Sequence, residues 1–157
     1  MSTRKSLAPK LIIGGVLLIV AAAAVAVILP NLLYPKTNLW LGDGIFRATI
    51  AKTSSDRSKG LLGQSGLASD QALIMVFDKE DRWAITMNGM EIDLDIVWLD
   101  KNKKVVHIVK NASPDSGTFE PSVPAQYVIE LSAGTVDRKS INRNSVAIFE
   151  MKEGGVE

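Results

Sequence analysis

The sequence predicts a mainly β fold: a compact β-sandwich or small barrel with one or two short helices, preceded by a single transmembrane helix. Two observations predict it. Near the N-terminus, 19 consecutive residues carry no charged or polar side chain, which is typical of a membrane span. After residue 43, short stretches of alternating apolar and polar residues follow one another, separated by Gly, Pro, Asn and Asp, as in small all-β domains.

The apolar stretch covers residues 11–29, and no charge occurs before Lys36, so we predict a transmembrane helix over 11–34. Nineteen helical residues extend about 28 Å, close to the thickness of the hydrocarbon core of a bilayer. The preceding tail, 1–10, contains three basic residues, which favours a cytoplasmic N-terminus and a C-terminal domain outside the plasma membrane. The lipid bilayer is thus the first predicted partner, and Trp40 is placed to reach the membrane interface.

A cleavable signal peptide is the alternative, because Ala24 and Ala26 flank Val25 in the small-x-small pattern of a cleavage site. Against it, the apolar run continues beyond Ala26 and exceeds the length that is usual for a signal peptide. Both interpretations export the domain. They differ in whether the protein stays tethered or is secreted after cleavage near Ala26.

The rest of the chain is predicted to contain a linker over 35–42, one domain over 43–151 and a tail over 152–157. Residues 53–56 (TSSD) supply candidate N-caps for one or two helical turns around Arg57, with Gly60 and Gly63 as candidate ends, and a helical turn is expected around Asp137. Residues 94–98 and 105–109 are expected to form a hairpin. Seven or eight short strands are expected in all, among them 46–50, 72–77, 83–87, 94–98, 105–109, 126–133 and 146–151.

The composition excludes several classes of function. The chain contains no Cys, so it has no disulfide, no thiolate nucleophile and no Cys-based metal site. Its 18 basic and 17 acidic residues are interspersed, and the part after the apolar stretch is slightly acidic. Nucleic-acid binding needs a basic patch to neutralise phosphates, so no nucleic-acid partner is expected.

Five short motifs follow one another along the predicted domain: 57–62 (RSKGLL), 72–77 (ALIMVF), 94–100 (LDIVWLD), 127–131 (YVIEL) and 133–134 (AG). In this order and with these gaps they resemble the domain of unknown function 192 family, over roughly residues 43–151. The resemblance implies a compact β-sandwich with jelly-roll character, commonly behind a signal or anchor segment. It implies no established activity.

Candidate ligand-binding residues lie in these motifs and beside them: Arg57, Met87, Asp95 and Glu130. We expect Asp95 to be partly buried and to pair with a residue such as Arg57. The chain also departs from the family pattern, which has an aromatic Trp-Met-Lys-Asn run where residues 86–89 read Thr-Met-Asn-Gly, and a Pro where Asp93 stands. If residues 86–89 belong to the functional surface, the function of this member is altered.

Three carboxylates precede and begin the predicted strand 94–98. Glu91, Asp93 and Asp95 alternate with apolar residues, so an extended backbone would place them on one face about 6.6–7 Å apart. Carboxylate oxygens can bind Ca²⁺, and His107, the one histidine, could add a nitrogen ligand for Zn²⁺. The alternative is a solvated strand face. No other cofactor is predicted.

Two functions remain open. The first is a non-catalytic binding or interaction domain at the cell envelope, which recognises an envelope protein, a glycan or a small ligand. Trp83, Trp98 and Tyr127 could stack on a sugar, but the phase of Trp83 and Trp98 with aliphatic neighbours favours core packing. The second is a metal-dependent or carboxylate-based enzyme that uses Glu91, Asp93, Asp95 and His107.

Overall fold

The computed structural model describes residues 35–151 of the chain. The predicted transmembrane helix over 11–34, the tails 1–10 and 152–157, and the cleavage position at Ala26 lie outside the described residues. Within the described part, no helix is long and apolar enough to cross a membrane. A compact unit begins at Lys36.

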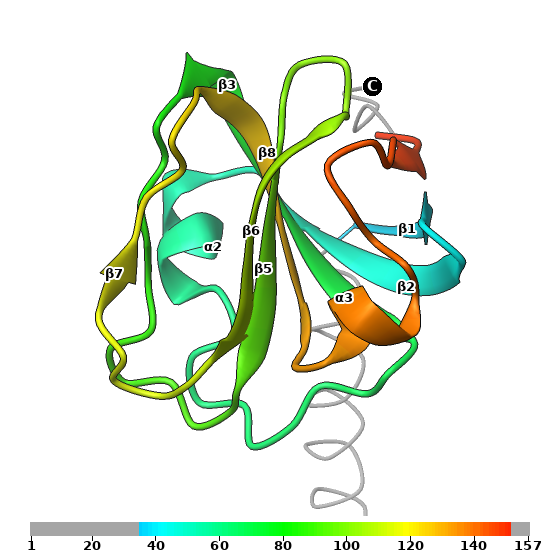
Figure 1. Cartoon of the computed structure of the whole chain (residues 1–157). Helices are drawn as coiled ribbons and strands as arrows, with labels where there is room; N and C mark the ends of the chain where they lie inside the picture. The colour runs from blue at the N-terminus through cyan, green and yellow to red at the C-terminus, as the bar shows by residue number, and fades with distance from the viewer. Residues whose placement is uncertain (1–34, 152–157) are drawn as a thin grey trace, which may run out of the picture. The chain divides into compact units, whose positions relative to one another are not determined.

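A mixed sheet of seven strands forms the framework of this unit (Figure 1), in the order β6-β5-β8-β3-β2-β1-β9. Neighbouring strands are antiparallel except β2 and β3, which are parallel. A second sheet pairs β4 (Ile85–Thr86) with β7 (Thr118–Phe119). The seven strands of the large sheet are β1 (Lys36–Leu41), β2 (Gly44–Ala51), β3 (Gln71–Asp81), β5 (Leu94–Leu99), β6 (Val105–Ala112), β8 (Ala125–Ser132) and β9 (Ile148–Phe149).

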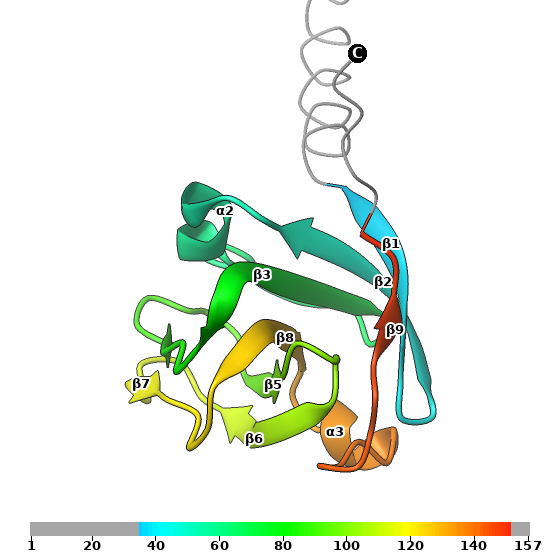
Figure 2. The ribbon, with the colours of Figure 1, turned by 90° about the horizontal axis from the view of Figure 1, so that it is seen from above.

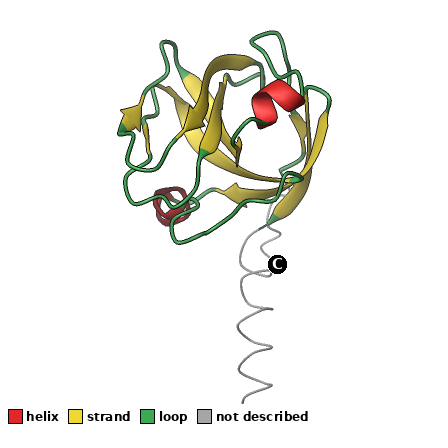
Figure 3. Ribbon diagram, turned by 60° about the horizontal axis from the view of Figure 1, so that its bottom comes forward, coloured by secondary structure: helices red, strands yellow, loops and turns green. Residues whose placement is uncertain are grey.

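Two short helices accompany the strands, α2 (Ser54–Lys59) and α3 (Thr135–Arg138). They lie far apart on the domain (Figures 1 and 2), and strands dominate the view in Figure 3. The prediction of a mainly β domain with one or two short helices is therefore confirmed. Helix α2 lies in the crossover that joins the parallel strands β2 and β3, because parallel neighbours cannot be joined by a tight hairpin.

The two edges of the large sheet are joined. Lys104, just before edge strand β6, forms a bridge with Val146, just before edge strand β9. The backbone N–H of Val105 donates to the Ser145 carbonyl at 3.0 Å, and that of Ala147 donates to the Lys103 carbonyl at 2.9 Å. The sheet thus curls toward a barrel. Of the two predicted architectures, a sandwich and a small barrel, the curled sheet is closer to the barrel.

An apolar core lies on each side of the sheet. The core inside the curl contains Leu39, Phe46 and Ile129. The outer core contains Met75, Ile96 and Trp98, and it is covered by the turn after α2 and by the small β4–β7 sheet. All six residues of β5 are consequently buried. A strand that is covered on both faces is expected to be mainly apolar, and in 94–99 only Asp95 is not.

Local sequence explains the boundaries of α2. The Thr53 hydroxyl accepts a hydrogen bond from the Asp56 backbone N–H at 3.1 Å, and the Asp56 carboxylate accepts one from the Thr53 N–H at 3.3 Å. This reciprocal pair is a capping box. The helix ends at Gly60, whose φ of 47° and ψ of −127° suit glycine. The predicted helix around Arg57 is confirmed, and of the candidate N-caps Thr53 is the one used.

Three predicted elements differ from the structure. Residues 36–41, predicted within a linker over 35–42, form β1, because Leu39 and Leu41 enter the inner core while Asn38 and Trp40 face outward. The predicted strands 83–87 and 146–151 shorten to β4 and β9, which have two residues each. Prediction of these strands relied on alternation, but loop residues can also alternate between core and solvent. The predicted hairpin is confirmed as β5 and β6.

Candidate functional site

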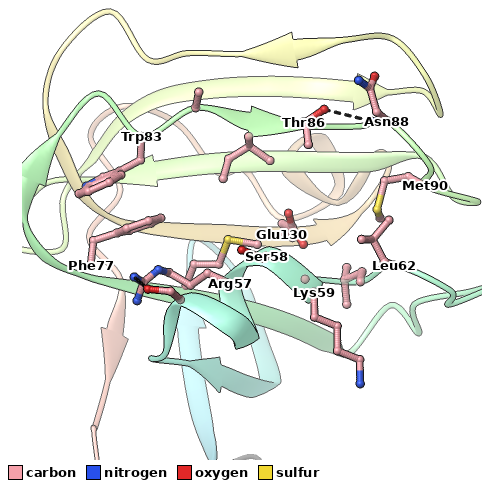
Figure 4. Close-up of a pocket in the computed structure, with 16 residues that line it drawn as sticks. Arg57, Ser58, Lys59, Leu62, Phe77, Trp83, Thr86, Asn88, Met90 and Glu130 are labelled. Carbon is pink, nitrogen blue, oxygen red and sulfur yellow. Dashed lines mark hydrogen bonds between the residues drawn. The ribbon is translucent and has the colours of Figure 1, made fainter.

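A cavity of about 420 Å³ lies on the outer face of the sheet, between α2 and the segment that contains β4 (Figure 4). Its walls come from four parts of the fold. These are α2 with the turn that follows it (Ser54 and 57–62), β3 (Met75 and Phe77), the segment around β4 (83–86, Asn88 and Met90) and β8 (Glu130). The volume lies within the range of small-molecule sites, and most of the lining side chains are apolar or uncharged.

Glu130 is the buried carboxyl group of this pocket, with 4% of its surface exposed. It lies in the middle of β8, in register with Leu73 of β3 and Ile96 of β5, which both belong to the outer core. Its Oε2 atom is buried and has no hydrogen-bond partner among the described residues. Burial raises the pKa of Glu130 from 4.5 to about 7. Such an unsatisfied, desolvated group indicates a functional site.

Gly60 ends α2 and borders the cavity beside Glu130. A Cβ atom added at this position would lie 3.4 Å from the Met75 Cε atom and 3.9 Å from Glu130 Oε2, which are ordinary contact distances. The positive φ of 47°, a backbone conformation that other residues avoid, therefore explains the glycine here.

Arg57 and two aromatic rings form one wall. The Arg57 guanidinium donates to the carbonyl oxygens of Lys52 and Val76, the latter at 2.9 Å, and it lies over the Phe77 ring at 4.8 Å. The Phe77 and Trp83 rings are stacked, with centroids 4.2 Å apart and planes inclined by 11°. The Arg57 contacts hold α2 against β3, and the stacked Phe77 and Trp83 rings present aromatic surface to the pocket.

Asp95 does not belong to this pocket. It is fully buried, and its Oδ1 and Oδ2 atoms accept hydrogen bonds from the backbone N–H groups of Asn111 at 2.8 Å and Val136 at 2.7 Å. The expected pairing of Asp95 with Arg57 is therefore wrong. The two side chains lie on opposite faces of the sheet, because Asp95 alternates with Leu94 and Ile96 of the outer core, whereas Arg57 lines the pocket on the outer face. Asp95 joins β5 to β6 and to α3.

The three carboxylates considered for a metal ion do not come together. Glu91 and Asp93 are exposed, whereas Asp95 is buried against backbone amides. Residues 91–93 precede β5 and are not extended strand, so the regular alternation that would align the three side chains is absent. Among residues 35–151, no group of three or more His, Asp and Glu side chains could hold a metal ion.

His107 also lies away from the pocket. It is on β6, in register with Trp98, and its ring packs edge-on against the Trp98 ring at 5.3 Å. Desolvation, and to a lesser extent the charge of Arg143, lowers the pKa of His107. Its Nδ1 atom is buried without a hydrogen-bond partner in the described part of the chain.

The predicted aromatic platform for a sugar does not form as a set of three. Trp98 is fully buried in the outer core, and Tyr127 is buried in the inner core, on the opposite side of the sheet. Trp83 alone of the three lines the pocket. The predicted core packing is confirmed for Trp98, whereas Trp83 is only partly buried against the outer core.

Comparison with protein-family models gives a match over residues 39–148 to DUF192, described as an uncharacterized ACR. The chain belongs to the DUF192 family. This match begins four residues earlier than the resemblance seen in the sequence, in β1. No protein of curated function matches the chain.

Two crystal structures share the fold. A protein of Sinorhizobium meliloti 1021, described as a candidate transcription regulator, has a TM-score of 0.71 and 23% identity, over 74% of this chain and 95% of its own. A protein of unknown function from Novosphingobium aromaticivorans DSM 12444 has a TM-score of 0.68 and 23% identity, over 73% and 84%. At this identity, the likeness extends to the fold alone.

The segment in which this DUF192 member departs from the family pattern lies at the pocket. Thr86 and Asn88 line the cavity, and the Asn88 backbone N–H donates to the Thr86 hydroxyl at 3.2 Å. Gly89 has a φ of 76° and donates to the Asp115 carboxylate at 3.0 Å. Met87, the candidate ligand-binding residue of this segment, is fully buried and belongs to the outer core. Two small polar side chains, those of Thr86 and Asn88, therefore stand at this wall.

Of the four candidate ligand-binding residues, the DUF192 fold thus brings Arg57 and Glu130 to one pocket. Sequence reasoning missed Gly60, Phe77, Trp83 and Met90 as members of it. A charged residue within the apolar run 127–131 was the signal that marked Glu130. No comparable signal marked Phe77 or Trp83, because aromatic residues in phase with a strand indicate core packing.

Proposed function

We propose that this DUF192 protein is a membrane-anchored, extracytoplasmic binding module, and that it holds a small ligand in the pocket above Glu130 without transforming it. The observation that supports binding most directly is the Oε2 atom of Glu130, buried and without a partner among the described residues, at the wall of a cavity. On folding, this oxygen atom loses its hydrogen bonds to water and gains none from the described residues. A bound ligand would supply the missing hydrogen-bond donor.

The composition of the pocket favours binding over catalysis. Glu130 is the one Asp, Glu or His among the lining residues that the structure describes. General acid–base or nucleophilic catalysis usually needs a second group within hydrogen-bond distance of the first. The Arg57 guanidinium is committed to carbonyl oxygens of Lys52 and Val76.

The membrane location is supported by the apolar stretch 11–29 and by one surface of the domain. Trp40 of β1 is in register with Ile45 of β2 on one side and Ile148 of β9 on the other, and all three side chains are exposed. Opposed residues of antiparallel strands share a face, so they form an apolar row. An interfacial Trp beside aliphatic side chains suits contact with lipid headgroups.

Ligand binding is tested with a variant that fills the pocket. Ser58 and Ser55 are both exposed on α2, but Ser58 lines the cavity and Ser55 does not. The full-length chain in detergent is screened by thermal shift against water-soluble amines, alcohols, acids and sugars. Ligands of the pocket should stabilise the wild type and Ser55→Trp, but not Ser58→Trp. The proposal fails if no compound stabilises the wild type, or if Ser58→Trp responds equally.

The membrane location is tested separately in cells that express the chain. The protein is expected in the membrane fraction after alkaline extraction, with its C-terminus accessible to protease added outside spheroplasts. Recovery in the alkaline supernatant, with a mature N-terminus after Ala26, would favour secretion. Protection from external protease would contradict export of the domain altogether.

A further inference from the structure

We infer that the pocket selects a small, mainly apolar molecule that carries a protonated amine, and that the ammonium group pairs with the carboxylate of Glu130. This inference rests on the proposed binding function and names its ligand class. Three features of the pocket carry it: the unpartnered carboxyl oxygen of Glu130 among apolar neighbours, the hydrogen bonds that already occupy Arg57, and the aromatic wall.

The first feature is the missing donor at Glu130. Its strand neighbours in register, Leu73 and Ile96, are aliphatic, so the sheet supplies no side-chain donor on either side. The Oε2 atom has no hydrogen-bond partner in the part of the chain that the structure describes. An ammonium group brings both a positive charge and N–H donors. It therefore neutralises the charge of the buried carboxylate and also donates the hydrogen bond that its Oε2 atom lacks.

The second feature is the charge distribution around the cavity. An anionic ligand would meet the Glu130 carboxyl group within a poorly hydrated space, which is unfavourable. Two cationic residues line the pocket, Arg57 and Lys59. Arg57 directs its guanidinium to the Lys52 and Val76 carbonyls and to the Ser54 hydroxyl, and Lys59 is exposed at the last position of α2. The pocket thus offers the Glu130 carboxylate as a hydrogen-bond acceptor, while the Arg57 guanidinium is already bound to oxygen atoms of the protein.

The third feature is the wall. Phe77 and Trp83 form a stacked pair, and Met75 and Met90 add thioether side chains. Aromatic faces attract cations, and methionine adapts to irregular apolar shapes. A cavity of about 420 Å³ accommodates one ring or a short alkyl chain beside the amine.

Binding should depend on pH through Glu130. The other charged residues that line the pocket are Arg57 and Lys59, both on α2; the lining residues of β3 and of the segment 83–90 add none. Burial raises the pKa of Glu130 to about 7 in the empty pocket. The amine needs the ionised form, so its affinity should fall about tenfold for each pH unit below 7 and level off above it.

Three compounds of nearly equal shape provide the test: phenethylamine, 2-phenylethanol and phenylacetate, which are cationic, neutral and anionic. Their affinities for the full-length chain in detergent are measured by titration calorimetry at pH 8 and pH 6. We expect phenethylamine to bind at least tenfold more tightly than 2-phenylethanol at pH 8, and phenylacetate to bind most weakly. The preference for the amine should shrink at pH 6.

Variants assign the preference to Glu130. Glu130→Gln keeps the shape of the side chain but removes its charge, and it should lower the affinity for phenethylamine to that for 2-phenylethanol. Glu91→Gln changes an exposed carboxylate outside the pocket and should leave all three affinities unchanged. Partition of the compounds into detergent is the same for all three proteins, so it cancels in the comparison.

The outcomes separate this inference from the proposed function. If 2-phenylethanol binds as tightly as the amine, or if Glu130→Gln keeps the preference, the amine inference is wrong. Loss of that same binding in Ser58→Trp would still support the binding function. If none of the three compounds binds the wild type, the amine inference is likewise overturned, and the broader screen with Ser58→Trp decides whether the pocket binds ligands of another class.

Discussion

The Oδ2 atom of Asp95 lies 2.7 Å from the backbone nitrogen of Val136, so a buried carboxylate of β5 holds the first turn of α3. The other oxygen, Oδ1, accepts from the backbone N–H of Asn111, a residue with a φ of 50° near the end of β6. One side chain therefore joins β5, β6 and α3. This geometry assigns Asp95 to the stability of the fold.

Asp95→Ala is expected to reduce the free energy of unfolding by about 2–4 kcal/mol, because it leaves the buried N–H group of Val136 and the part-buried N–H group of Asn111 without their acceptor. Asp95→Asn keeps one acceptor oxygen and should cost less. Both values are measured by urea denaturation. Asp93→Ala, at an exposed position two residues earlier, serves as the control and should change the stability by less than about 0.5 kcal/mol. Equal effects of Asp95→Ala and Asp93→Ala would contradict this assignment.

Glu130 should make the folded protein less stable at high pH. Burial raises the pKa of Glu130 from 4.5 to about 7, so between these pH values the folded state keeps a proton that the unfolded state releases. The free energy of unfolding therefore decreases as the pH rises through this window, and the full loss, on the order of 3 kcal/mol, is present above pH 7.

Glu130→Gln removes this titration. Its stability relative to the wild type should increase by roughly 1–3 kcal/mol between pH 4 and pH 8, as measured by denaturation at both pH values. Comparing the same pair of proteins at two pH values cancels the cost of burying the new amide. Glu91→Gln, at an exposed position, should show no such increase. A pH-independent difference between Glu130→Gln and the wild type would refute the burial of an ionisable group here.

Arg57 should resist replacement by lysine. Its guanidinium reaches two carbonyl oxygens, those of Lys52 and Val76, and covers the Phe77 ring. A lysine ammonium lacks the planar fork that makes these contacts together, so Arg57→Lys should cost about 1–2 kcal/mol.

Arg47→Lys is the matched control for this experiment, since Arg47 pairs with Asp70 at the surface, where the two side chains are 70% and 53% exposed. Exposed pairs contribute little, so this change should cost less than about 0.5 kcal/mol. Thermal or urea denaturation of both variants measures the difference. A similar cost for the two substitutions would mean that Arg57 contributes no more than a surface ion pair.

Trp40 should report contact between the domain and the membrane. The full-length chain is reconstituted in vesicles that contain brominated lipid, and tryptophan fluorescence is recorded. Trp40 is 41% exposed in the row with Ile45 and Ile148, so Trp40→Phe should abolish most of the quenching. Trp83→Phe should leave it unchanged, because Trp83 is partly buried against Phe77. Quenching that survives in Trp40→Phe would exclude this row as the lipid-facing surface.

Much of the fold could be predicted because it is encoded locally. The capping box of Thr53 and Asp56 and the terminal Gly60 define α2 within eight residues of sequence. The run 94–99, the turn and 105–112 form a hairpin whose partners are close along the chain. The transmembrane helix over 11–34 also rests on a local property, continuous hydrophobicity, and it stays a prediction.

The pocket and the residues that line it became known only from the tertiary structure. Arg57 and Glu130 are far apart in sequence, and they line the same cavity because β8 pairs with β3, whose preceding crossover contains α2. The same pairing buries Glu130 between aliphatic neighbours and so raises its pKa. Sequence alone identified both residues as candidates, yet it assigned Arg57 to Asp95. Hydrophobic periodicity determines which side chains are buried, whereas long-range strand pairing determines which of these side chains contact one another.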